Sequence, residues 1–176
     1  MIGIEAVKSS TPAPCRKMIK DAISIIMNES EDNVQKYIRK MRSDFRNMDP
    51  AEIAFPRTCN NVEKYGNRLT IYSKGTPMHV RGSLLFNHYL KQKNLEGKYN
   101  VINNGEKIKF CYLKNPNPIH ENVISFTSVL PKEFDLHRFV DYDLQFDKSN
   151  VEQLKNIVQL INWNVEPVSS LDTYFE

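Results

Sequence analysis

The feature that most constrains the fold is a pair of amphipathic segments delimited by prolines. Pro12 and Pro14 precede the first segment, and Asp49-Pro50 follows the second. Proline presets the backbone angle of a first helical turn and cannot sit in a helix interior, so these positions predict where helices begin and end. Between them, apolar residues recur at helical spacing. The sequence therefore predicts an antiparallel helix hairpin over residues 14–48.

The two expected helices meet near Ser30, which offers an N-cap followed by Glu31 and Asp32 in the first turn. The second helix also carries several basic side chains between Lys36 and Arg46. A charged helix face is usually solvated, so we favour that interpretation over a nucleic-acid-binding stripe. The apolar seams are Cys15, Met18, Ile19, Ala22, Ile23 and Ile26 in the first helix, and Val34, Ile38, Met41, Phe45 and Met48 in the second.

The middle of the chain predicts a smaller mixed region. Residues 55–61 read as a non-helical connection, and a third helix is expected to follow Val80-Arg81-Gly82. Glycine there permits either a close backbone approach or an unusual dihedral at the helix start. Asn103-Asn104-Gly105 indicates a tight turn joining strands at residues 99–102 and 107–113. A further short strand is expected at residues 123–126. The predicted fold class is α+β, with a small antiparallel sheet.

The last third of the chain predicts a further helix. Ser149 and Glu152 form a capping-box pattern, and apolar residues continue at helical spacing to Trp163. The carboxylates in this region do not share one tight helical face, so we expect no metal site among them. These carboxylates are Asp135, Asp141, Asp143 and Asp147.

Composition allows one domain with a substantial core. The chain has 176 residues, 40% of them hydrophobic, and a formal net charge of +3, which permits a polyanionic partner without requiring one. Cys15, Cys59 and Cys111 are odd in number and widely spaced, which favours a reducing compartment over a disulfide framework or a zinc site. No apolar run approaches the roughly 20 residues of a membrane span, so no membrane partner is expected.

Residues 3–12 combine a lysine, several hydroxyl groups and a helix-starting proline. The hydroxyls of Ser9, Ser10 and Thr11 could cap the helix by accepting from its unpaired N–H groups. Those N–H groups, together with Lys8, could instead hold a phosphate of nucleic acid. The residues alone favour a cap and leave both interpretations open.

This stretch resembles the family-B DNA polymerases of T-even-type bacteriophages, at the point where the palm domain passes into the C-terminal thumb. Further similar blocks follow in the order that the family shows, and the similarity covers essentially the whole chain. These blocks are Ile53-Ala54 and residues 60–65, 79–87, 105–108 and 170–175.

The resemblance implies a mainly helical polymerase thumb, residues 1–168, that grips primer-template DNA without sequence preference in the cytoplasm of an infected host cell. Residues 55–61 are rich in hydrogen-bond donors, and by themselves they would be interpreted as an ordinary polar connection. The resemblance favours DNA contacts instead, because the matching loop of the family lies along the newly made duplex. The expected DNA-binding residues are Lys8, Ser9, Ser10, Thr11, Arg57, Thr58, Asn60, Asn61, Lys64 and Arg81.

Catalytic residues are not expected in this chain. The sequence lacks the Tyr-Gly-Asp-Thr-Asp, Ser-Leu-Tyr-Pro-Ser and Lys-Lys-Arg-Tyr motifs of the family. The resemblance therefore implies that Mg²⁺ and catalysis belong to the palm of an N-terminal portion or partner chain, with no cofactor here. A free-standing enzyme of another class is disfavoured, because no GxSxG, HExxH or phosphate-binding glycine loop occurs. The alternative is a non-catalytic DNA-binding or clamp-interacting accessory protein.

The last eight residues, 169–176, are expected to form a separate tail. By position alone they would be a frayed terminus. Leu171, Tyr174 and Phe175 nevertheless resemble the clamp-binding tail of replicative polymerases, in which an aliphatic residue and two aromatic residues fill a pocket on the sliding clamp. Val168 stands where many such motifs carry glutamine.

Overall fold

The computed structural model describes residues 8–167, which fall into two compact units. The first, here called the helical unit, contains the described residues up to Met48 and those from Phe146 onward. The second, the sheet unit, is the continuous stretch Asp49–Gln145. About half of the structure is helical and its strands pair antiparallel, which confirms the α+β prediction.

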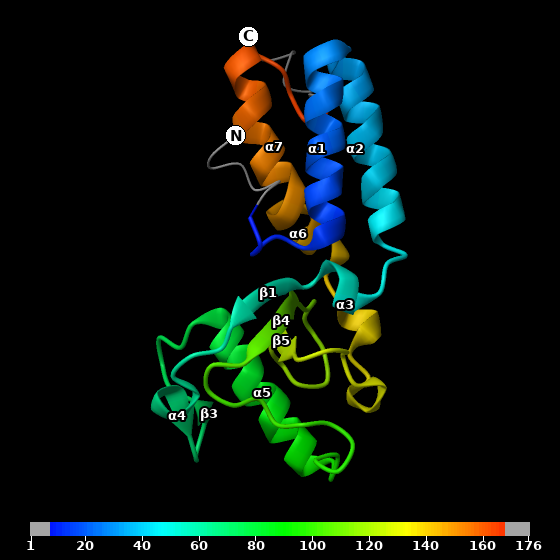
Figure 1. Ribbon diagram of the computed structural model, residues 1–176. Coiled ribbons are helices and arrows are strands. Elements are labelled where there is room, and N and C mark those ends of the chain that lie inside the picture. Colours follow the sequence, from blue (N-terminus) through cyan, green and yellow to red (C-terminus); the bar gives the residue numbers. More distant parts are fainter. Residues whose placement is uncertain (1–7, 168–176) are drawn as a thin grey trace, which may run out of the picture. The chain divides into compact units, whose positions relative to one another are not determined.

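Two antiparallel helices, α1 (Ala13–Asn28) and α2 (Glu31–Phe45), form the predicted hairpin, and α7 (Glu152–Val158) packs against α1 (Figure 1). Ser30 caps α2 as expected, because its hydroxyl accepts from the Asn33 N–H at 3.4 Å. Most of the predicted seam is buried, namely Cys15, Met18, Ile19, Ala22, Val34, Ile38 and Phe45, while Ile23, Ile26, Met41 and Met48 are half-buried.

The predicted helix start at Ser149 is wrong. The helix is already running there: α6 (Tyr142–Phe146) continues through η4 (Asp147–Val151), a π-helical turn, into α7 and then η5 (Gln159–Ile161). Ser149 is buried, and its hydroxyl donates to the Phe146 carbonyl at 3.4 Å while accepting from the Asn150 amide at 2.8 Å. A hydroxyl occupied in this way is satisfied within the helix and does not start one.

The sheet unit is built on three antiparallel strands in the order β1-β4-β5, namely β1 (Phe55–Thr58), β4 (Lys107–Tyr112) and β5 (Val123–Phe126). Helix α5 (Met78–Gln92) lies along this sheet and packs mainly against β5 (Figure 1). A small hairpin of β2 (Gly66–Asn67) and β3 (Ile71–Tyr72) contacts the same helix. The remaining short helices are α3 (Pro50–Ile53), α4 (Val62–Tyr65), η2 (Lys132–Phe134) and η3 (His137–Phe139).

Two sequence expectations for this sheet are wrong. Residues 55–58 form strand β1 rather than a loop, and β1 takes the place beside β4 that was predicted for residues 99–102. Ile102 does not pair in a sheet, because the Asn87 side chain binds both its N–H, at 2.7 Å, and its carbonyl, at 2.8 Å. The Asn103-Asn104-Gly105 turn does form, with Gly105 at φ 84°. It connects the irregular residues 100–103, rather than a strand, to β4.

Helix α5 begins at Met78, six residues before the leucine pair at which helical periodicity becomes clear. Gly82 therefore lies inside the helix with ordinary helical backbone angles, so of the two alternatives the close approach is confirmed and the unusual dihedral is not. A Cβ atom at this position would lie 2.4 Å from Ser125 Oγ and 2.7 Å from Ser125 N. The absence of a side chain at Gly82 thus sets how closely α5 lies on β5.

Candidate nucleic-acid interface

The first predicted group, residues 8–11, forms a turn directly before α1 in the helical unit. The Thr11 N–H donates to the Lys8 carbonyl at 3.2 Å, and Thr11 is only 3% exposed. Lys8 and Ser9 are exposed. The N-cap position is occupied by Pro12, whose side chain makes no capping hydrogen bond. Lys8 and Ser9 therefore face solvent at this turn, whereas Thr11 is buried in the helical unit.

The second group lies on β1 and the residues after it, and strand pairing fixes its shape. Arg57 is opposite Ile108 and Thr58 is opposite Lys107 in the ladder. The ladder continues beyond the strand, since the Cys59 N–H donates to the Glu106 carbonyl at 2.8 Å. Cys59 is buried, while Thr58 and the asparagines that follow are exposed. The sheet edge therefore holds a row of donors at the surface.

Arg57 is oriented by aromatic neighbours. Its guanidinium carbon lies 5.9 Å from the ring centroid of Phe55 and 5.8 Å from that of Phe110, and its Nη1 donates to the Pro56 carbonyl at 2.8 Å. Aromatic rings at these distances attract a guanidinium and restrict its orientation. The pKa of the neighbouring His79 is lowered, first by burial and second by the charge of Arg57. This corner of the sheet unit is thus electropositive with a neutral imidazole beside it.

The asparagine pair ends in an unusual backbone conformation. Asn61 has φ 62° and its N–H donates to Asn104 Oδ1 at 2.5 Å, which ties the start of α4 to the turn before β4. One turn later, the exposed Lys64 places its Nζ 5.5 Å from the ring centroid of Tyr65. Asn60, Asn61 and Lys64 are therefore held on the surface next to the end of β1.

Arg81 occupies a different environment from the other predicted residues. Its Nη2 donates to Asn122 Oδ1 at 2.5 Å, its Nε lies 4.0 Å from Glu121 Oε2, and its guanidinium lies over the ring of Tyr72 at 5.7 Å. Tyr72 also donates to Glu121, and this hydrogen bond, with burial second, raises the pKa of Tyr72. Arg81 thus links α5 to β3 and to the segment before β5, and a DNA contact by Arg81 stays a prediction.

Sequence reasoning missed three cations of the sheet unit. Lys107 is exposed directly opposite Thr58, but the pairing of β1 with β4 that brings them together has no local sequence signal. Arg68 and Lys91 line a pocket beneath the β2–β3 hairpin. Helical spacing of Asn87, His88 and Lys91 could have indicated one polar face of α5, although not its partner.

The basic residues of α2 are partly used inside the helical unit. Arg42 donates to Asp147 at 2.7 Å and to Glu166 at 2.9 Å, and Lys36 pairs with Asp32 at 2.6 Å. These pairs support the interpretation of this helix as an ordinary charged surface with one internal link.

Across residues 8–167, no group of three or more histidine, cysteine or acidic residues is arranged to hold a metal ion. None of the helices in this range combines the length and apolar content of a membrane span.

The predicted clamp-binding residues Leu171, Tyr174 and Phe175 lie outside the described residues, as do residues 3–7. The predicted DNA-binding residues are therefore distributed as follows. Lys8, Ser9, Ser10 and Thr11 belong to the helical unit, whereas Arg57, Thr58, Asn60, Asn61, Lys64 and Arg81 belong to the sheet unit.

The chain is homologous to DNA-directed DNA polymerases of bacteriophages. It is 28% identical over 179 residues to the DNA-directed DNA polymerase of Enterobacteria phage T4, a match that covers 99% of this chain and 19% of the polymerase. It is 29% identical over 181 residues to that of Escherichia phage RB69, covering 100% of this chain and 20% of that protein. The chain thus spans about a fifth of the length of the curated relatives it matches. No family model matches the chain.

Proposed function

We propose that this chain is the thumb portion of a phage-type DNA polymerase and grips the primer-template duplex behind the site of synthesis. The observation that carries the proposal is homology to two phage DNA polymerases along the whole chain. The surface chemistry supports it. Arg57, Lys64 and Lys107 lie on or beside the exposed end of β1, together with the hydroxyl and amide donors of Thr58 and Asn60.

These donors suit phosphates better than bases. Arginine and lysine side chains with neighbouring hydroxyl and amide groups are the usual contacts to phosphate oxygens, which fix register without reading sequence. Lys8 and Ser9 add similar exposed donors in the helical unit. Binding is therefore expected to be independent of sequence and strongly dependent on salt.

Fluorescence anisotropy with two unrelated duplexes tests this proposal. Equal affinity for both is expected, and log affinity should fall with log salt by about 0.9 for each phosphate engaged. The R57A/K64A variant should lower that slope by roughly 1–2, because each lost phosphate contact removes about one unit. The K93A/K132A variant, which removes two charges from exposed residues of the same unit, is the matched control. Salt-independent or strongly sequence-selective binding would contradict the proposal.

Catalysis would then reside elsewhere. Phosphoryl transfer by polymerases requires carboxylates that hold metal ions, and the sequence carries none of the palm motifs that supply them. We propose that an N-terminal portion or a partner chain supplies that palm and its Mg²⁺. Primer extension should show no incorporation by this chain alone and synthesis when the matching palm portion is added.

The tail is proposed to bind a sliding clamp. Burying Leu171, Tyr174 and Phe175 could contribute roughly 1.5–3 kcal/mol each before ordering costs, enough for a modest affinity that tethering on DNA multiplies. Removing residues 169–176 should abolish binding to the cognate clamp and leave duplex binding nearly unchanged. Clamp titrations of the intact and shortened chains are the measurement, and equal affinities would refute the assignment.

A further inference from the structure

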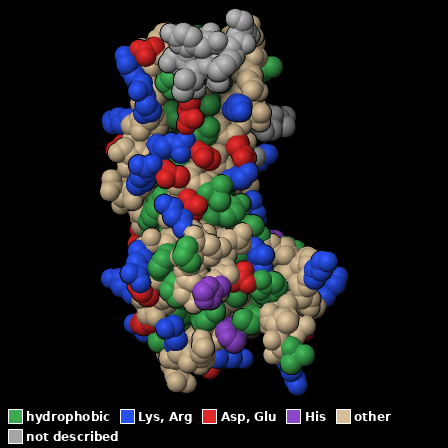
Figure 2. Space-filling view, turned by 180° about the vertical axis from the view of Figure 1, so that it is seen from behind, with side chains coloured by type: hydrophobic (Ala, Val, Ile, Leu, Met, Phe, Trp, Pro, Cys, Tyr) green, Lys and Arg blue, Asp and Glu red, His purple; other side chains and the backbone are tan. Residues whose placement is uncertain are grey.

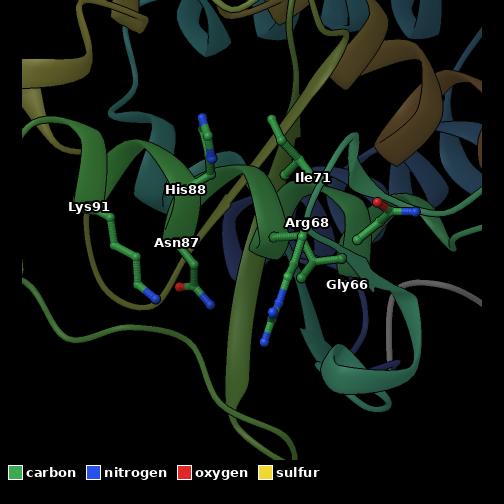
Figure 3. A pocket seen from close by; sticks show the side chains of 8 residues that line it. Gly66, Arg68, Ile71, Asn87, His88 and Lys91 are labelled. Carbon is green, nitrogen blue, oxygen red and sulfur yellow. The ribbon is translucent and has the colours of Figure 1, made fainter.

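A pocket of about 320 Å³ lies between the β2–β3 hairpin and α5. Gly66, Asn67, Arg68 and Ile71 line it from the hairpin side, and α5 contributes the remaining lining residues, Leu84, Asn87, His88 and Lys91. Figure 3 shows the side chains of Arg68, Asn87 and Lys91 extending toward the same side, while His88 extends the other way. One cation from the hairpin, and one cation and an amide from α5, thus lie at the same hollow.

The hollow has the chemistry of an anion site. None of the residues that line it is acidic. Within residues 8–167, no hydrogen bond or ion pair occupies the charged groups of Arg68 and Lys91, and both side chains are exposed. Asn87 is anchored through Ile102, as described above, and one of its amide hydrogens is left to donate. A guanidinium, an ammonium group and an amide N–H form a typical donor set for phosphate oxygens.

The hairpin that carries Arg68 is held in shape from within. Asn67 Oδ1 accepts from the N–H groups of Leu69, at 2.8 Å, and Thr70, at 3.2 Å, while Thr70 Oγ1 donates to the Tyr72 carbonyl at 2.8 Å. Ile71 has φ 67°, which is an unfavourable conformation for a β-branched residue and persists only where surrounding contacts enforce it. The base is fixed by the Tyr72, Glu121 and Arg81 contacts. Arg68 and Leu69 are therefore displayed by a defined turn.

The end of this turn is apolar and fully presented to solvent. Leu69 is 94% exposed, more than any other large hydrophobic residue among those described. Figure 2 shows Lys and Arg side chains at the margins of the lobe formed by α4 and the hairpin, next to hydrophobic surface. An apolar side chain next to a cation suits the backbone of a nucleic acid, where an apolar deoxyribose surface adjoins each phosphate.

We propose that this pocket binds a phosphate group, that the phosphate belongs to the backbone of a nucleic acid, and that Leu69 packs against the adjoining sugar. The assignment of the backbone as the source rests on the proposed function, whereas the phosphate chemistry of the pocket does not. Free phosphate is the other source of the same chemistry, and the experiment separates the two. This contact is separate from the donors at the end of β1.

The first arm measures duplex affinity of the full chain at several salt concentrations. The R68Q/K91Q variant should bind about 10-fold more weakly at moderate salt, with a slope reduced by about 1, because one phosphate contact is lost. The K93Q/K132Q variant removes the same charge from two exposed residues of the same unit and should change affinity less than about 3-fold. The L69S variant should weaken binding about 3-fold with an unchanged slope, since no charge is removed.

The second arm follows backbone amide NMR shifts of the chain during titration with inorganic phosphate. Shifts at Gly66, Asn67 and Arg68 that disappear in R68Q/K91Q are expected.

If the wild-type chain binds duplex but R68Q/K91Q and K93Q/K132Q behave alike, the pocket proposal is overturned and the proposed function stands. If duplex does not bind while phosphate still shifts the pocket, the proposed function and the nucleic-acid source are overturned and a free-phosphate site is supported. If neither ligand acts on the pocket, the proposal fails entirely.

Discussion

Single atoms decide the spacing between α5 and the sheet. Gly82 faces Ser125, whose hydroxyl donates to the His79 carbonyl at 2.8 Å, and Ser83 donates to the same carbonyl at 2.8 Å. Two hydroxyls thus converge on one backbone acceptor where the helix and strand come closest. The backbone of β5 cannot retreat without disturbing this arrangement.

We therefore expect the G82A variant to destabilise the sheet unit by about 1–3 kcal/mol, the usual cost of inserting a methyl group into a filled interface. The Cβ atom would meet the Ser125 backbone nitrogen at 2.7 Å, so relaxation of a side chain alone cannot relieve the clash. Urea denaturation provides the measurement. Gly97 is the matched control, because nothing lies within 4 Å of its Cβ position and G97A should be nearly neutral. Equal effects of both substitutions would contradict this account.

The ionisation of His79 offers a residue-scale measurement beside Arg57. Burial and, secondarily, the Arg57 charge hold its pKa below the ordinary value of 6.5. The unfolded chain therefore binds a proton more readily, so the contribution of His79 to stability is complete above pH 6.5 and declines as pH falls toward the folded pKa. We expect an NMR titration midpoint below 6.5 that rises in the R57A variant, and no rise in K132A.

The same imidazole reports on ligand binding. A phosphate placed on Arg57 would neutralise the field that disfavours the imidazolium form, so duplex DNA should raise the pKa of His79. An unchanged midpoint at saturating DNA would show that Arg57 is not among the phosphate contacts.

At the scale of elements, α2 is joined to both the π-helical turn and the C-terminal segment by one side chain. Arg42 is 20% exposed, lies 4.9 Å from the Phe146 ring centroid and binds Asp147 and Glu166. Gln35 adds a second link, since its amide donates to the Asn164 carbonyl at 3.0 Å. These contacts hold Asp147, Asn164 and Glu166 against α2.

Replacing Arg42 with alanine should cost about 1–2 kcal/mol of stability, because charged hydrogen bonds and ring packing are lost together. The E166Q variant should cost less than about 0.5 kcal/mol, since Glu166 is 57% exposed and the interaction is screened. The K36A variant, which breaks an exposed pair with Asp32, provides the control and should be close to neutral. Chemical denaturation followed by circular dichroism distinguishes these outcomes, and an R42A effect no larger than that of K36A would argue against the link.

The elements that could be predicted are those with local signals. Helices α1 and α2 follow from periodic apolar residues, from Pro12 and from the Ser30 cap, and the turn at Gly105 follows from its asparagine-glycine sequence. The pairing of β1 with β4 could not be predicted, because it joins residues about fifty positions apart. The Asn-Gly turn instead favoured a local hairpin between residues 99–102 and β4. The helix start predicted at Ser149 was wrong because the local capping pattern does not show that this residue is buried, in a turn that packs against α1. The pocket could not be predicted because it forms where the β2–β3 hairpin packs against α5, and this tertiary contact has no local sequence signal.

On the scale of the whole molecule, the sheet unit is continuous in sequence and the helical unit is not. A continuous unit with its own core can fold alone. We expect residues 49–145 to give a cooperative unfolding transition and dispersed amide NMR signals when produced as a separate chain. Residues 8–48 produced alone should remain largely unfolded, because the partners of their apolar seam come from residues 146–158. A molten sheet unit would contradict this expectation.

The interrupted helical unit also sets an order of events during synthesis. The ribosome delivers α1 and α2 first, but Phe146, Leu154 and Val158, which complete their core, follow only after the sheet unit, residues 49–145, has been made. At roughly 5–20 residues per second, this interval lasts about 5–20 s. During that time the sheet unit can finish folding, while the seam containing Ile19, Ile38 and Phe45 remains open to chaperones or to premature association.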